Sequence, residues 1–154
     1  MGFSNHVQII PSSPFVEIGC MCLFLCIEVA RNSTGIFLSQ RKYALDIIYK
    51  VGLLGAKPAP VPLEQNHNLA LTDGPLLSDP KRYKRLVGRL IYLSATHPKL
   101  SYCVHVLSQF MQQPQERHWD VALRVMRYLK GNPGQGILLR SDCDLQLYAW
   151  CDSD

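Results

Sequence analysis

Hydrophobic residues in the first third of the chain are spaced first as in strands and then as in a helix. Two apolar, β-favouring runs, 23–29 and 35–38, are separated by a polar turn that contains Asn and Gly, which predicts a β-hairpin. Next, Ser39 is placed to cap a helix that ends at Gly52, because serine is a good N-cap and glycine suits a left-handed exit. The apolar residues of that helix recur at helical spacing and are Tyr43, Ala44, Ile47, Ile48 and Val51.

Three more helices are predicted between residues 80 and 131. The first begins at Asp79-Pro80, the second follows Pro98, and the third follows Pro114 and ends at Gly131, since proline and glycine are typical of these boundaries. Their apolar residues recur every three or four positions and are Tyr83, Leu86, Val87, Leu90, Ile91 and Ser94, then Leu100, Cys103, Val104, Leu107 and Met111, then Trp119, Ala122, Leu123, Met126 and Leu129. Because the joints are short, the three helices should pack as a small bundle.

The remaining segments are predicted to be irregular, apart from a second pair of strands. Residues 1–17 contain two prolines and two consecutive serines, so ordered structure should begin near Ile18, and 55–79 is a long connector rich in proline. Two apolar runs, 136–139 and 145–150, flank a polar turn near the end. The predicted fold class is α+β, with a β-hairpin, a helical bundle and a C-terminal strand pair. Its abrupt end after an apolar strand suggests a fragment of a larger fold.

Composition indicates one globular domain inside the cell. The chain has 154 residues, of which 47% are hydrophobic and 18% charged, enough to bury a core without metal or disulfide. Its six cysteines are scattered and follow no secretory leader, so they should be reduced. The spacing Cys20-x-Cys22-x3-Cys26 permits zinc, but buried strand thiols fit it better. We expect an intracellular protein without signal peptide or transmembrane segment, since the apolar run 18–27 is too short to cross a bilayer.

The net charge of +4 conceals a basic middle and an acidic C-terminal segment. Between residues 81 and 99 there are six cations and no acid, namely Lys81, Arg82, Lys84, Arg85, Arg89 and Lys99. Four of them crowd the first turns of a predicted helix, where the helix dipole disfavours each cation by about 0.3–1 kcal/mol. A phosphate backbone would explain this placement, and a solvated charged face is the competing interpretation. A second basic stripe on the third helix could flank the same groove and consists of Arg117, Arg124, Arg127 and Lys130.

A candidate for metal-dependent catalysis is the pair Asp152 and Asp154, which follow the last predicted strand. Two-metal nucleases hold Mg²⁺ with clustered carboxylates. Two carboxylates are too few for such a site, so the spacing alone favours a polar chain end. The sequence shows no glycine loop that would cradle phosphate and no nucleophile spaced to pair with a base. We therefore expect no bound cofactor.

Several strings along residues 22–154 together resemble the Pol polyprotein of copia-type retrotransposons. They keep that family's order and spacing, and such an ordered set is not expected by chance. The strings are FLCIEVAR at 24–31, GIFLSQRKY at 35–43, RYKRLVGRLIYL at 82–93, SQFM at 108–111, HW at 118–119, RYLKG at 127–131 and YAWCDSD at 148–154.

The resemblance implies the last part of a reverse transcriptase. Residues 23–38 would be the primer-grip hairpin, 39–131 thumb-like helices over the template–primer duplex, and 145–154 the opening strand of RNase H, with Asp152 as its first carboxylate. The family enzyme uses Mg²⁺, but its Tyr-x-Asp-Asp polymerase turn is not found here. The isolated chain should therefore be catalytically inactive, with Asp152 as a remnant of an incomplete metal site.

The resemblance also implies two partners, the rest of the Pol polyprotein and an RNA–DNA hybrid or duplex. Weak, sequence-independent contact with nucleic acid is expected through Lys81, Arg82, Lys84, Arg85, Arg89, Arg124 and Arg127. The implied organisation is an unmatched irregular lead at 1–21, the reverse transcriptase segment at 22–131, and a connection with the first RNase H strand at 132–154. Cys26 stands where the family usually has glycine. A small helical protein-interaction module with no nucleic-acid role is the alternative.

Overall fold

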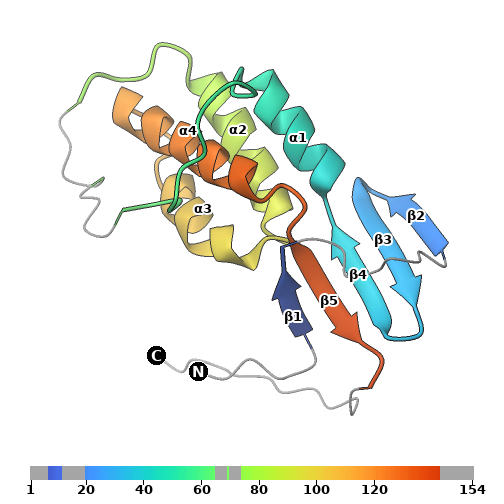
Figure 1. The fold of residues 1–154 in the computed structure, drawn as a ribbon. Coiled ribbons are helices and arrows are strands. Elements are labelled where there is room, and N and C mark those ends of the chain that lie inside the picture. The colour runs from blue at the N-terminus through green and yellow to red at the C-terminus, as the bar shows by residue number, and fades with distance from the viewer. Residues whose placement is uncertain (1–6, 12–19, 65–68, 70–73, 143–154) are drawn as a thin grey trace, which may run out of the picture.

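The fold is α+β, as the sequence predicts. The computed structural model describes residues 7–11, 20–64, 69 and 74–142 (Figure 1). Five antiparallel strands form one sheet in the order β1-β5-β4-β3-β2, and their bounds are β1 (Val7–Ile10), β2 (Cys20–Phe24), β3 (Ile27–Asn32), β4 (Gly35–Ser39) and β5 (Gly136–Arg140). The helices are α1 (Arg41–Lys50), α2 (Pro80–Leu93), the 3-10 turn η2 (Pro98–Leu100), α3 (Ser101–Ser108) and α4 (Glu116–Gly131).

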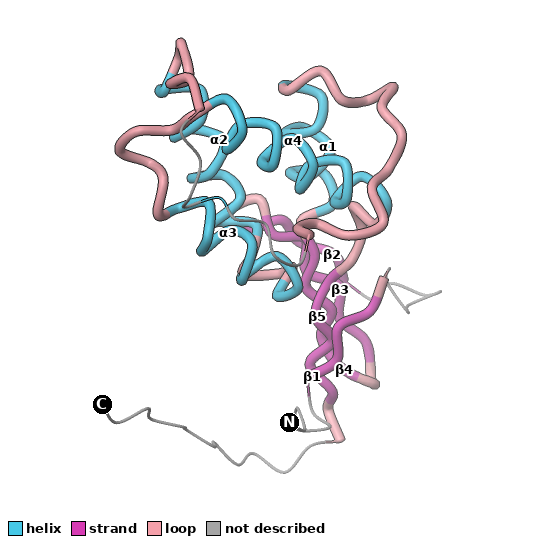
Figure 2. The backbone as a smooth tube through the Cα atoms, turned by 90° about the vertical axis from the view of Figure 1, so that its left-hand side faces the viewer, coloured by secondary structure: helices cyan, strands magenta, loops and turns pink. Residues whose placement is uncertain are grey.

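The helices gather at one end of the sheet, and the strands extend away from them (Figure 2). Chain order explains this arrangement, because β4 leads directly into α1 and α4 leads back into β5. The predicted connector 55–79 contains no α-helix or β-strand among its described residues, and an isolated bridge pairs Leu76 with Gln115 before α4. Within the described chain, no helix combines the length and the apolar character that a membrane span requires.

The helices share one hydrophobic core, and the predicted apolar stripes account for most of it. Tyr83, Ile47, Leu107 and Met126 are fully buried, one from each helix. One stripe prediction on α2 is wrong, because Ile91 is 47% exposed, whereas Leu93, which was not predicted, is fully buried. A wheel of 100° per residue places both near the edge of the apolar face, and only the packing of neighbouring helices decides between them.

The predicted N-terminal hairpin exists, but its first strand is shorter than the sequence suggested. The apolar run 23–29 is two strands, β2 and β3, which pair with each other around a turn at Leu25 and Cys26. Both turn residues have positive φ angles, 49° and 61°, a conformation that usually selects glycine or asparagine. Because both are hydrophobic, the turn could not be recognised from the pattern. The predicted pairing of β3 with β4 is confirmed.

The expectation of an irregular lead over 1–17 is wrong at residues 7–10. These residues form β1, which pairs antiparallel with β5 from Val7 opposite Leu139 to Ile10 opposite Gly136. An unpaired edge of β5 would leave backbone donors and acceptors without partners, and β1 satisfies them. The predicted partner of β5, residues 145–150, lies outside the described residues, and β5 pairs with β4 instead.

Helix boundaries follow the sequence except at the start of α1 and the end of α3, which stops at Ser108, before the predicted stripe residue Met111. Asp79 caps α2 through bonds from the amides of Lys81 (3.0 Å) and Arg82 (3.2 Å), and Gly52 has the left-handed φ of 75° expected after α1. Ser39 is not the cap of α1, because it ends β4 and its hydroxyl donates to Glu28 (3.3 Å). That carboxylate also accepts from the amide of Lys42 (2.8 Å), so a neighbouring strand supplies the capping group.

Candidate nucleic-acid interface

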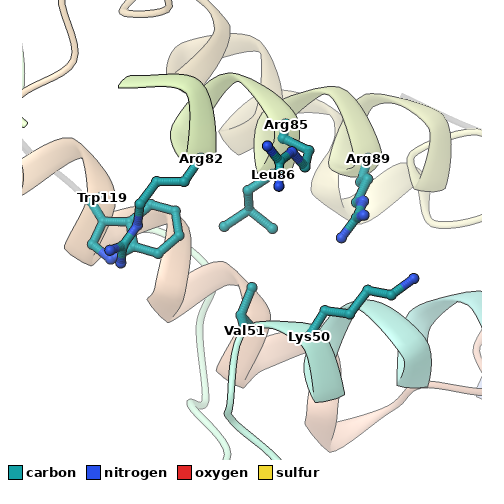
Figure 3. A pocket seen from close by; sticks show the side chains of 7 residues that line it. All are labelled: Lys50, Val51, Arg82, Arg85, Leu86, Arg89 and Trp119. Atoms are coloured by element: carbon teal, nitrogen blue, oxygen red, sulfur yellow. The ribbon is translucent and has the colours of Figure 1, made fainter. Parts of the chain in front are cut away.

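A groove of about 490 Å³ runs between α2 and the end of α1, with the start of α4 at one end. Figure 3 shows three arginines reaching into it from α2, with Trp119 at one end and Lys50 on the opposite wall. Its described lining contains four cations and no carboxylate, and consists of Lys50, Val51, Arg82, Arg85, Leu86, Arg89 and Trp119. The groove is therefore suited to an anionic occupant.

The arginines lie in a row because of the helical repeat. Arg82, Arg85 and Arg89 are three, four and seven positions apart, so they share one face of α2. Among the described residues, no salt bridge involves any of the three. Lys81 and Lys84 are also exposed but do not line the groove. The five α2 cations of the sequence prediction are thus divided into three groove residues and two outside it.

The groove ends at a stacked pair of side chains. The guanidinium carbon of Arg82 lies 3.9 Å from the centre of the Trp119 ring, a cation–π contact. Trp119 is held at the start of α4, where Gln115 and the His118 side chain form a capping box and the His118 ring stacks on Phe110 at 4.0 Å. Trp119 was assigned to the core stripe, and the structure shows it half-buried with an edge on the groove.

Lys50 completes the groove from the other side and was missed by sequence reasoning. It forms an i,i+4 salt bridge with Asp46 (2.6 Å), and both side chains are about half exposed (48% and 44%). Such exposed pairs contribute only about 0.3–0.5 kcal/mol to stability. Lys50 can therefore exchange Asp46 for another anion with little loss of free energy. No local signal identifies it, because it is brought to α2 by the packing of α1 in the tertiary fold.

The basic residues of α4 do not join the α2 arginines in the groove. Arg124 forms a salt bridge with Glu64 and donates from its Nε to the carbonyl of Val61 (3.4 Å). Lys130 donates to the carbonyls of Leu54 and Ala56. Both side chains therefore hold the connector against α4. Arg127 is exposed and is not a groove residue, so contact of Arg124 and Arg127 with nucleic acid stays a prediction.

A buried polar cluster beneath the helices has a structural role. The Thr96 hydroxyl donates to the Gln40 side-chain oxygen (2.8 Å) and lies 3.0 Å from Nδ1 of His97. Burial lowers the pKa of His97 to about 4, so the ring is neutral at physiological pH. The cluster links the start of α1 to the end of α2 and contains no nucleophile suited to catalysis.

A metal site is not found in the part of the chain that the structure describes. No three or more His, Cys, Asp or Glu residues come together there. Asp152, the predicted remnant carboxylate, lies outside the described residues, as does Asp154. Cys26 is exposed, and the side chains of Cys20 and Cys22 are not described.

Comparison with known proteins gives the relatives of this chain. It is 44% identical over 131 residues to the retrovirus-related Pol polyprotein from transposon RE2 of Arabidopsis thaliana, a match over 85% of this chain. It is 30% identical over 131 residues to the retrovirus-related Pol polyprotein from transposon TNT 1-94 of Nicotiana tabacum, over 80% of this chain. The chain is homologous to a segment of retrovirus-related Pol polyproteins. The predicted resemblance to Pol polyproteins is thereby confirmed.

The shared segment is a small part of a Pol polyprotein. The chain spans 9% of the length of the transposon RE2 polyprotein and 10% of that from TNT 1-94. An uncharacterized mitochondrial protein of Arabidopsis thaliana is 36% identical over 140 residues, which cover 90% of this chain and 57% of that protein. No family model matches the sequence, and no solved structure matches it.

Proposed function

We propose that the chain is a segment of a copia-type reverse transcriptase that contacts the template–primer duplex. In this proposal residues 23–38 correspond to the primer grip, 39–131 to the thumb, and the segment up to Asp154 to the start of RNase H. The observation that carries the proposal is the row Arg82, Arg85 and Arg89, which lines a groove without carboxylates on a chain homologous to Pol polyproteins.

The physical argument for a phosphate partner rests on charge placement. The first turn of α2 contains no acid, and the helix dipole there disfavours the cations that crowd it. The Asp79 carboxylate is occupied with the amides of Lys81 and Arg82. Selection for folding alone would favour acids at these positions, whereas phosphate contacts favour cations. Such contacts position a nucleic-acid backbone and read no bases.

The proposed role is binding without catalysis. The sequence contains no Tyr-x-Asp-Asp polymerase turn, and Asp152 with Asp154 supplies too few carboxylates for a two-metal site. In an intact Pol polyprotein the remaining parts would supply the catalytic groups and Mg²⁺. The chain itself would then act by positioning the duplex.

Binding of the purified chain to an RNA–DNA hybrid tests the proposal. Fluorescence anisotropy should show weak binding, with log affinity falling linearly with log salt. The double variant Lys84→Glu, Arg85→Glu should weaken binding equally across sequences. It should also flatten the salt slope by roughly one unit for each phosphate that the variant no longer neutralises.

A matched control is the variant Lys57→Glu, Lys99→Glu, which makes the same change of charge at two exposed lysines off α2. It should affect the salt slope less. Equal binding by wild type and the α2 variant at low salt would refute the proposal. Salt-independent binding to a protein partner would favour a helical interaction module instead.

A further inference from the structure

We infer that the α1–α2–α4 groove holds a short unpaired stretch of nucleic acid, with a base stacked at the Arg82–Trp119 end and phosphates along Arg85, Arg89 and Lys50. This inference rests on the proposed nucleic-acid role and narrows it. A duplex would contact α2 from outside, whereas the groove would take a strand whose bases are free.

The composition of the groove supports an unpaired strand. Proteins that bind single strands combine a cationic groove that follows the backbone with an aromatic side chain on which a base stacks. Here the cations come from two helices that face each other across the groove, and Trp119 closes one end (Figure 3). Leu86 and Val51 add an apolar floor. Apolar side chains can contact the faces of bases and sugars, but they offer a phosphate neither a hydrogen bond nor a charge.

The stacked pair at the groove end is a platform for one base. The Arg82 guanidinium carbon lies over the Trp119 ring, 3.9 Å from its centre. Arg82 is exposed, so the pair is accessible from solvent. Guanidinium planes and aromatic rings both stack on bases, and stacking on an aromatic ring contributes about 1–3 kcal/mol per base.

The size of the groove favours an unpaired strand over a duplex as its occupant. A volume of about 490 Å³ lies within the roughly 300–1,000 Å³ typical of small-ligand pockets, so it admits one or two nucleotides. In a duplex the bases are paired and stacked on each other, and none is available to Trp119. A duplex would therefore use the cations but leave the stacking platform and apolar floor empty.

The spacing of the cations suits successive phosphates. Arg85 and Arg89, the two α2 residues assigned to phosphates, are four residues apart, which corresponds to about 6 Å along the helix axis. Lys50 faces this row from the end of α1. Its salt bridge with the half-exposed Asp46 is weak enough to be exchanged for a phosphate.

Intrinsic fluorescence gives a direct test in the full chain. The sequence has two tryptophans, Trp119 and Trp150. In a Trp150→Phe variant, the tryptophan fluorescence therefore comes from Trp119 alone. An oligothymidylate of roughly eight nucleotides, within the usual site sizes, should quench Trp119, and a blunt RNA–DNA hybrid of equal length should not. Replacing Trp119 with Leu should weaken oligothymidylate binding about tenfold by anisotropy, and Trp119→Phe should retain most of it.

Two charge-matched variants of α2 distinguish the contribution of the groove cations to binding from that of the cations outside the groove. Arg85→Gln, Arg89→Gln removes two groove cations, and Lys81→Gln, Lys84→Gln removes two cations of the same helix outside the groove. The groove variant should lower affinity for the single strand about tenfold or more and flatten its salt slope by about 1.4 units. The lysine variant should have a smaller effect. Circular dichroism should show unchanged helix content in both.

The possible outcomes separate this inference from the proposed function. Equal losses in the two variants, or hybrid binding without single-strand quenching of Trp119, would overturn the inference and leave duplex contact standing. Single-strand binding in the groove without any hybrid binding would support the inference and overturn the duplex contact. Binding of neither nucleic acid at low salt would overturn both.

Discussion

The hydroxyl of Tyr83 on α2 donates a hydrogen bond of 2.8 Å to the main-chain carbonyl of Leu107 at the end of α3. Both residues are fully buried, and burial raises the pKa of Tyr83. The bond adds a directional contact between two helices that also pack through their apolar faces. It therefore contributes to the orientation of α2 and of the arginine row on this helix.

Replacing Tyr83 with Phe should lower the free energy of unfolding by about 1 kcal/mol. This loss of stability is near the lower end of the range for removing one partner of a buried hydrogen bond. The reason is that the Leu107 carbonyl keeps a second donor, the amide of Phe110 (3.2 Å). Urea unfolding measures the change. Tyr102→Phe is the control, since Tyr102 is 67% exposed and should alter stability little. A similar destabilisation in both variants would argue against the buried bond as the cause.

The substitution Cys26→Gly should stabilise the protein by about 1 kcal/mol. Cys26 has a φ of 61°, and the left-handed region costs a residue with a side chain roughly 1–2 kcal/mol, part of which is offset by the greater flexibility of glycine when unfolded. Thermal unfolding measures the gain. Ser33→Gly is the control in the next turn, where φ is not positive, and it should destabilise. A destabilised Cys26→Gly variant would contradict the strained turn.

Stability should fall as the pH is lowered from about 6.5 to about 4. Burial lowers the pKa of His97 from 6.5 to about 4 and also lowers that of His118, so the unfolded chain binds protons that the folded chain excludes. The stabilisation is complete above pH 6.5 and is lost toward pH 4, by about 2–3 kcal/mol for His97. Urea titrations across this range measure the effect. The His97→Gln variant should show a weaker pH dependence, and an unchanged dependence would exclude His97 as its source.

The purified chain should neither extend a primer nor cleave an RNA–DNA hybrid in Mg²⁺ or Mn²⁺. The reason is that the sequence contains no Tyr-x-Asp-Asp turn and that Asp152 and Asp154 are too few carboxylates for a two-metal site. Primer-extension and hybrid-cleavage assays provide the measurement. Activity that disappears in the Asp152→Asn variant would show that the site is complete enough to work, contrary to this expectation.

The helices could be predicted because their boundaries and faces are determined locally. Asp79-Pro80 and Gly52 mark ends through their own backbone preferences, and the buried residues recur at a fixed period. The turn at Leu25 and Cys26 could not be predicted, because its residues contradict the local preference of the backbone they adopt. The strand β1 was missed since its pairing with β5 depends on a partner far along the chain.

The candidate site was predicted in part for the same reason. The α2 arginines were found because their charge breaks a local rule about helix ends. Lys50 and Trp119 reach the groove only through the packing of α1 and α4 against α2. The division of the α2 cations between groove and open surface likewise depends on the positions of the neighbouring helices. These positions cannot be predicted from the α2 segment alone.

The pairing of β4 with β5 has a consequence for the newly made chain on the ribosome. Every helix that the structure describes lies between these two strands in the sequence, so the edge of β4 remains open until residues 136–140 have emerged. An open edge readily joins a strand of another molecule, and pairings between distant segments form slowly. The helices, whose contacts are more local, would gather first and bring the two strands together. Synthesis halted shortly before Gly136 should therefore yield a species prone to self-association.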